Sequence, residues 1–232
     1  MSTTLVIGST GLVGNEALKA LIASSAFPTV QTIGRRAPKQ TSPKLQATVQ
    51  PDTTQWASAL KALTPVPATL ICGLGTTRAQ AGGIANQWKI DHDLNIELAQ
   101  AAKAAGVKTY VFISSASIRS LAGRNLPYGK MKIGVEDAIM GLGFDNAIIV
   151  RPGAIMGTRE QPHAGQGIIT AAIKGLGYLS QGIADSFGQD SDVIGKAAVA
   201  AAKLASEGKA PANPWILEQA DIVRLGRTEW KE

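Results

Sequence analysis

The sequence predicts an α/β domain in which helices cover both faces of a doubly wound parallel sheet. Short apolar runs of strand length alternate with longer segments whose apolar residues recur every three or four positions. Turn residues rich in Gly, Pro and Thr separate them at the spacing of strand–helix–strand units. The expected strands are 4–7, 30–34, 45–49, 69–74, 110–113, 147–150 and 215–217.

The helices are expected between these strands. The clearest helix covers 87–105, where Ile90, Leu94 and Leu98 share one face and Gly106 is a natural C-terminal stop. Four other helices are expected. One follows the glycine-rich turn after the first strand, and one includes Trp56 and Leu60. The remaining two cover 128–140 and 193–205.

One domain is expected over 1–232, because neither a low-complexity linker nor an internal repeat divides the chain. Residues 156–190 are rich in Gly and irregular in pattern. In a doubly wound sheet such a segment caps the carboxyl ends of the strands, where ligands bind. We therefore expect 156–190 to cover the substrate, with Arg159 and His163 either facing it or lying in solvent.

The composition limits the classes of function. The chain has 45% hydrophobic and 17% charged residues, the balance of an ordinary globular protein. One cysteine excludes an intrachain disulfide, and with two histidines no metal site is expected. The net charge of +6 comes without dense Lys/Arg runs, so no nucleic-acid partner is expected. The chain lacks an apolar stretch of transmembrane length, and its first strand starts too early for a cleaved leader, so a cytoplasmic protein is expected.

A glycine-rich turn joins the first expected strand to the first expected helix, with the spacing G-x-x-G-x-x-G. Glycines here permit a tight turn and a close approach of the backbone to a pyrophosphate, and the helix N-terminus adds N–H donors. A lone glycine pattern is weak evidence, but its place after the first strand favours a dinucleotide-binding, Rossmann-type fold. The residues expected to contact the pyrophosphate are Gly8, Ser9, Thr10, Gly11, Leu12, Val13 and Gly14.

The end of the second strand indicates which dinucleotide binds. NAD-binding proteins usually carry an acidic residue there, which accepts a hydrogen bond from the ribose 2′-hydroxyl. This chain has Arg35 and Arg36, whose guanidinium groups match a 2′-phosphate. The alternative is a pair of solvated surface arginines. NADP(H) is therefore the expected cofactor.

Three further residues carry acid/base chemistry. Tyr128 and Lys132 are four apart, so they share one face of the expected helix. An ammonium near a phenol favours the phenolate, which makes the tyrosine a usable general acid or base. Ser115 follows the fifth strand at the ligand-binding edge of the sheet. Taken singly, these residues are explained as a surface pair and a strand-end cap, but their combination with the glycine turn is hard to obtain by chance.

With these motifs in place, the chain resembles the short-chain dehydrogenase/reductase superfamily. It looks closest to the atypical branch that contains the fungal FMP52 family and the TIP30/CC3 oxidoreductase-like proteins. The stretches that carry the resemblance most specifically are 74–78, 81–83, 89–95, 128–132 and 151–153.

The resemblance implies roles for individual residues. It places Ser115, Tyr128 and Lys132 at the catalytic positions, with Lys132 also on the nicotinamide ribose. Asp91 stands where many members of the superfamily carry an asparagine that assists a proton relay. Peripheral association with the mitochondrial outer membrane is implied as well. The remaining cofactor contacts implied are Asp52, Leu74, Gly75 and Thr76 on the adenosine side, and Pro152 and Gly153 at the nicotinamide.

We therefore expect an NADPH-dependent oxidoreductase of the carbonyl reductase or alcohol dehydrogenase type, acting on a small molecule. Two alternatives stay open, because a fold alone does not fix a function. One is an NADPH-binding regulatory or redox-sensing protein without turnover. The other is a non-redox acid/base enzyme on the same fold. Neither the substrate nor the oligomeric state follows from the sequence.

Overall fold

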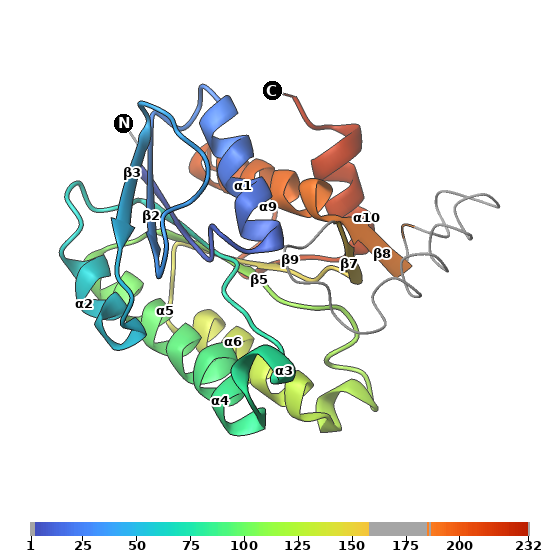
Figure 1. Ribbon diagram of the computed structural model, residues 1–232. Coiled ribbons are helices and arrows are strands. Elements are labelled where there is room, and N and C mark those ends of the chain that lie inside the picture. Colours follow the sequence, from blue (N-terminus) through green and yellow to red (C-terminus); the bar gives the residue numbers. More distant parts are fainter. Residues whose placement is uncertain (1–2, 158–184, 186, 232) are drawn as a thin grey trace.

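A computed structural model describes residues 3–157, 185 and 187–231 of the chain. Its main feature is a seven-stranded sheet with the order β3-β2-β1-β4-β5-β6-β9, in which every neighbouring pair is parallel (Figure 1). The expected doubly wound fold is therefore confirmed. The strands are β1 (Thr3–Ile7), β2 (Thr29–Gly34), β3 (Leu45–Val49), β4 (Thr69–Cys72), β5 (Thr109–Ile113), β6 (Asn146–Val150) and β9 (Trp215–Leu217).

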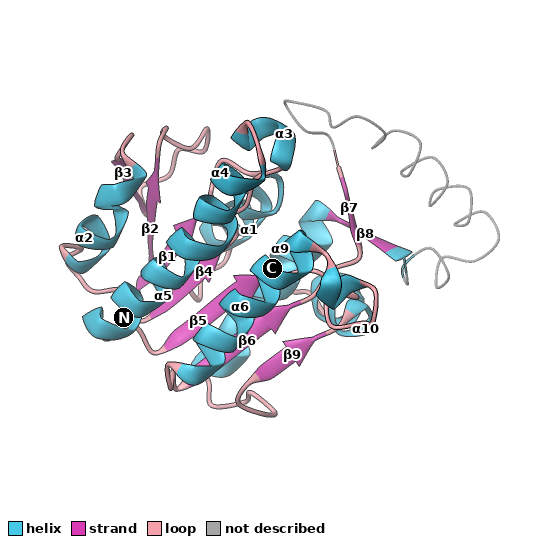
Figure 2. Cartoon of the chain, turned by 90° about the horizontal axis from the view of Figure 1, so that it is seen from below, coloured by secondary structure: helices cyan, strands magenta, loops and turns pink. Residues whose placement is uncertain are grey.

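Helices cover both faces of this sheet (Figures 1 and 2). On one face lie α1 (Leu12–Ala23) and α9 (Ser191–Ser206), and on the other α2 (Trp56–Lys61), α5 (Asn95–Ala105) and α6 (Pro127–Gly141). Successive strand residues point to opposite faces, so each strand serves two cores. In β1, Val6 belongs to the α1/α9 core while Leu5 and Ile7 belong to the other.

The smaller elements lie mostly in the connections. They are the strands β7 (Ala154–Met156) and β8 (Gly188–Asp190), the helices α3 (Arg78–Ala81), α4 (Ile84–Trp88) and α10 (Gln219–Val223), the 3-10 turns η1 (Thr53–Gln55) and η3 (Gly123–Asn125), and the π-helical turns η2 (Lys89–Leu94) and η4 (Arg224–Thr228).

Three expectations need correction. The helix expected over 87–105 is three pieces, α4, η2 and α5, because a π-helical turn interrupts the α-helical pattern. Strand β4 ends at Cys72, and Leu74 lies in the loop beyond it. The described ends of the segment 156–190 are not irregular, since β7 and β8 pair in parallel. Arg159 and His163, expected to face the substrate or solvent, lie outside the described residues.

The strand order places a ligand-binding crevice. From β1 the chain proceeds outward to β2 and β3, whereas from β4 it proceeds the other way to β5 and β6. The connections therefore diverge at β1 and β4, and in open α/β sheets ligands bind outside the carboxyl ends of the strands at that point. Within the described ranges, no helix combines the length and the apolar character needed to cross a membrane.

Candidate functional site

The glycine turn lies at the predicted crevice, between β1 and α1. Gly8 adopts a left-handed φ of +81°, and its carbonyl accepts from the Gly11 N–H at 2.9 Å. A Cβ on Gly8 would lie 2.7 Å from the carbonyl carbon of Gly73, and a Cβ on Gly14 would lie 2.2 Å from the Gly8 oxygen. Only glycine fits these two positions. Gly11 caps α1 without a side-chain hydrogen bond, so the first-turn N–H groups are left for an anion.

A pocket of about 270 Å³ opens at the carboxyl ends of β2, β3 and β4. Five residues predicted to contact a cofactor line it, and five that the sequence did not indicate complete its walls. The predicted ones are Arg35, Asp52, Leu74, Gly75 and Thr76. The others are Pro51, Thr53, Trp56, Ile90 and Leu94.

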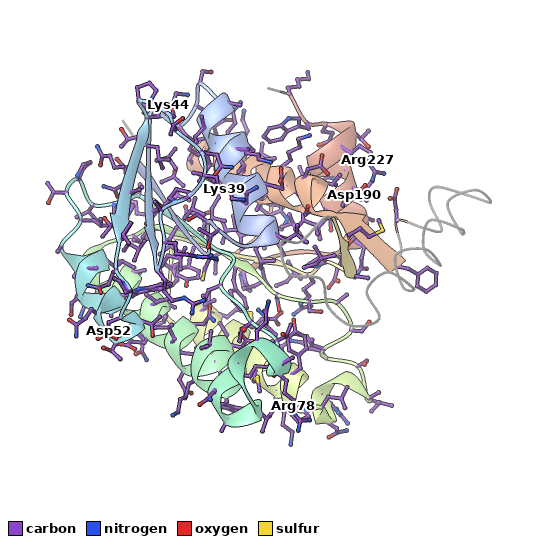
Figure 3. The ribbon with its side chains drawn as sticks, in the orientation of Figure 1. Lys39, Lys44, Asp52, Arg78, Asp190 and Arg227 are labelled. Carbon is purple, nitrogen blue, oxygen red and sulfur yellow. The ribbon has the colours of Figure 1, made fainter. Side chains whose placement is uncertain are left out.

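The two predicted phosphate-binding arginines differ in position. Both are exposed, but Arg35 lines the pocket and Arg36 is not among its lining residues. Neither forms an ion pair or a hydrogen bond with any other residue that the structure describes. Across the pocket, Asp52 lies beside α2 (Figure 3) and accepts from the Thr54 hydroxyl and N–H at 2.8 and 2.9 Å. These hydrogen bonds hold the pKa of Asp52 below its ordinary value.

The two serines after β5 have different environments. Ser114 is buried and its hydroxyl donates to Glu136 Oε1 at 2.7 Å. Ser115 is half-buried, and among the described residues its hydroxyl has a single contact, at 3.5 Å with the Ala116 carbonyl. The predicted catalytic serine is thus the one whose hydroxyl is left for a ligand.

Helix α6 carries both Tyr128 and Lys132, as predicted. Tyr128 lies in the first turn and is 40% exposed, and its hydroxyl bonds to no residue in the described part of the chain. Lys132 is 4% exposed; its Nζ donates to the Ile113 carbonyl at 3.1 Å and lies 4.6 Å from the centre of the Phe112 ring. The lysine is therefore held at the end of β5, while the tyrosine faces solvent one turn away.

A buried carboxylate that the sequence reasoning missed lies one turn further along α6. Glu136 is 0% exposed and accepts from Ser114, from Arg119 Nε at 2.9 Å, and from Arg151 Nε and Nη2 at 3.0 and 2.7 Å. Burial alone raises the pKa of Glu136, but the hydrogen bonds from Arg151 and Ser114 outweigh it and hold the pKa below its ordinary value. The signal was available: Glu136 continues the four-residue spacing of Tyr128 and Lys132 on one helix face.

The predicted nicotinamide-side residues follow β6. The Pro152 carbonyl accepts from the Ala116 N–H at 2.7 Å, which joins this loop to the one that carries Ser115. The Gly153 N–H donates to Oε1 of the fully buried Gln189 at 2.8 Å. Sequence reasoning did not indicate Gln189, because it is brought to Gly153 only by the pairing of β7 with β8.

The parallel sheet, the glycine turn at its crevice and the lysine-bearing helix are the features that the sequence led us to expect of a dinucleotide-binding domain. The sequence model described as the NAD dependent epimerase/dehydratase family matches residues 4–178. The chain belongs to this family, and the identity of its fungal relatives shows that it also belongs to the FMP52 proteins.

Protein FMP52, mitochondrial, of Chaetomium globosum is 57% identical over 100% of both chains. Protein fmp-52, mitochondrial, of Neurospora crassa is 55% identical over 100% of this chain and 98% of its own. Among solved structures, a short-chain dehydrogenase/reductase from Saccharomyces cerevisiae has a TM-score of 0.68 at 18% identity, covering 97% of this chain and 99% of that one. MoeE5 in complex with UDP-glucose and NAD has a TM-score of 0.66 at 16% identity, covering 98% and 81%. At such identities these structures show the fold alone.

Proposed function

We propose that this protein is an NADP(H)-dependent oxidoreductase of the carbonyl reductase or alcohol dehydrogenase type. The position of Lys132 carries the proposal. Its ammonium is buried at the ligand edge of the sheet, and within the described chain no carboxylate forms an ion pair with it. A buried charge without a direct counter-ion is costly, so such a group is a candidate for a functional role.

The residues around the crevice fit a dinucleotide. The glycine turn leaves no room for side chains and directs N–H groups toward a pyrophosphate, while the pocket beyond it has the apolar and polar walls that an adenosine needs. Arg35 lines the pocket and has no partner among the described residues, which supports a 2′-phosphate and hence NADP(H). When bound, the nicotinamide supplies or takes up a hydride.

The chain's own residues would handle the substrate oxygen and its proton. The Ser115 hydroxyl donates a hydrogen bond to the carbonyl oxygen and orients it. The Tyr128 hydroxyl gives that oxygen a proton during reduction and takes it back during oxidation. The Lys132 ammonium would balance the negative charge that this transfer leaves on Tyr128, and it is the group that would hold the nicotinamide ribose.

Titration of the purified protein with NADPH, NADP⁺, NADH and NAD⁺ tests the cofactor assignment, and replacing Tyr128 by Phe tests the chemistry. We expect tight NADPH binding that Arg35→Asp weakens, and a 10²- to 10⁴-fold lower turnover of a reactive diketone such as phenanthrenequinone in Tyr128→Phe, with NADPH affinity unchanged. Full activity in Tyr128→Phe would overturn the mechanism. If the protein binds none of the four nucleotides, the oxidoreductase assignment is overturned.

A second candidate is favoured by the family match, because epimerases and dehydratases need no net oxidation or reduction. The same Ser115, Tyr128 and Lys132 would then serve an acid/base reaction in which the cofactor is regenerated in each turnover. NADPH consumption in proportion to product would exclude this candidate.

The location is proposed from the relatives. Both FMP52 relatives described above carry the word mitochondrial in their names, which supports association with mitochondria for this chain. Cell fractionation with a salt wash would test it, since a peripherally bound protein is released from the organelle by salt.

A further inference from the structure

Asp91 lies in the π-helical turn η2 and is fully buried. One wide turn of this kind inside a helix is frequently found at functional sites. Here it is held by a side chain: the buried Asn95 donates from Nδ2 to the Ile90 carbonyl at 2.9 Å. The Asn95 Oδ1 in turn accepts from the Cys72 thiol at 3.2 Å, at the end of β4. The turn is therefore fixed to the sheet directly beneath the crevice.

Asp91 uses both carboxylate oxygens to hold the loop after β4. Oδ1 accepts from the Thr76 N–H at 2.7 Å, and Oδ2 accepts from Gln87 Nε2 at 3.1 Å. Gln87 also lies 3.4 Å from the Thr76 carbonyl, so the three residues form a closed ring of contacts. We call this ring of Asp91, Thr76 and Gln87 the Asp91 clamp. Asp91 is 0% exposed and Gln87 6%, and Thr76 lines the pocket.

The clamp also places a negative charge opposite Lys132. A Cβ on Gly75 would lie 3.8 Å from Asp91 Oδ1 and 4.0 Å from Lys132 Nζ, so the two charged groups flank this glycine. They attract each other without forming an ion pair. Glu136, the other buried carboxylate near Lys132 on α6, is already engaged by two arginines.

We propose that Asp91 is a positioning residue with two effects at the site proposed above. Through the clamp it holds Gly75 and Thr76 in the shape that receives the cofactor. Through its charge it balances the Lys132 ammonium, so that this ammonium stays at the strand end where the proposed reaction needs it. The inference rests on the proposed function for its second effect only.

The two effects are separated by two substitutions at one position. Asp91→Ala removes both the hydrogen bonds and the charge. Asp91→Asn keeps an acceptor for Thr76, and a turned Gln87 amide restores the second bond. The turn gives up the long 3.4 Å contact of Gln87 with the Thr76 carbonyl, so the charge is the main loss. Asp93→Asn is the matched control, because Asp93 lies in the same turn but is exposed and bonds only His92. NADPH affinity, kcat and KM with phenanthrenequinone, and Tm would be measured for the wild-type protein and the three variants.

We expect the NADPH Kd to rise about tenfold or more in Asp91→Ala, since two hydrogen bonds to a charged group are lost. In Asp91→Asn we expect a Kd within about threefold of the wild type, a kcat at least about tenfold lower, and an unchanged KM. Asp93→Asn should match the wild type throughout. A folded Asp91→Ala protein with wild-type affinity would overturn the clamp, and wild-type kcat in Asp91→Asn would overturn the charge effect. If the wild type binds NADPH but reduces no carbonyl, the proposed function fails while the affinity comparison still tests the clamp.

Discussion

Asp91 and Glu136 are both carboxylates with no exposed surface, yet their environments differ in kind. Glu136 is bonded to the guanidinium groups of Arg119 and Arg151 and to the Ser114 hydroxyl. Asp91 is bonded only to neutral N–H groups, and its nearest cation is not in contact. Burial raises the pKa of Asp91 above its ordinary value, and Lys132, Gln87 and Thr76 offset this only in part. The pKa of Glu136 moves the other way.

The difference separates a structural role from a functional one. Glu136 links α6 to the ends of β5 and β6, and Arg151 extends this network to Glu218 at 3.0 Å, just before α10. A fully partnered charge of this type holds elements together. Burial raises the pKa of Asp91, and its Oδ1 accepts from the N–H of Thr76, which lines the pocket. Perturbed, incompletely compensated groups in a cleft are typical of functional sites.

The largest expected effect tests the structural half of this comparison. Glu136→Ala removes the buried acceptor of the Ser114 hydroxyl and of two guanidinium groups, which keep only the exposed Asp137 and Glu218 as partners. This should lower the free energy of unfolding by about 3–5 kcal/mol. Asp137→Ala, on the same helix but exposed and paired only with Arg119, should cost less than about 1 kcal/mol. Urea denaturation of both variants measures the difference. Equal losses would show that the Glu136 network does not stabilise the fold.

The next effect tests the positioning role proposed for Asp91. It uses Gly75, which lies in space between the Asp91 carboxylate and the Lys132 ammonium. A Cβ there meets both groups at ordinary contact distance, so Gly75→Ala should fold normally. It narrows the pocket, however, and should raise the NADPH Kd about tenfold or more, because a misplaced atom in a binding site is not readily accommodated. Gly141→Ala, at the end of α6 with open space around it, is the control and should change neither quantity. Unchanged NADPH affinity in Gly75→Ala would place the cofactor elsewhere.

The sequence predicted the parts of the fold that local pattern determines. The seven strands of the large sheet were found because each is a short apolar run, and β9 matches its expected bounds. Ser115 follows β5, and Lys132 on α6 donates to the Ile113 carbonyl, so both lie near the carboxyl end of that strand. Local pattern did not reveal the π-helical turn, since its apolar residues still recur at a period close to that of an α-helix. Nor did it reveal the contact of Gln189 with Gly153, which joins residues far apart in the chain.

The smallest effects are opposite pH dependences of stability. Because the pKa of Glu136 lies below its ordinary 4.5, its stabilising contribution is complete above that pH and is lost as the pH falls through the folded-state pKa. The difference in free energy of unfolding between the wild type and Glu136→Gln should therefore become smaller as the pH is lowered below 4.5.

The pKa of Asp91 lies above its ordinary 3.8, so its contribution to stability is present below pH 3.8 and is lost as the pH rises through the folded-state pKa. Relative to Asp91→Asn, the wild type should accordingly lose stability as the pH rises from 3.8 through the folded-state pKa of Asp91. Urea unfolding of the three proteins at a series of pH values on both sides of 3.8 and 4.5 measures both slopes. Slopes of the same sign would contradict the distinction between the two carboxylates.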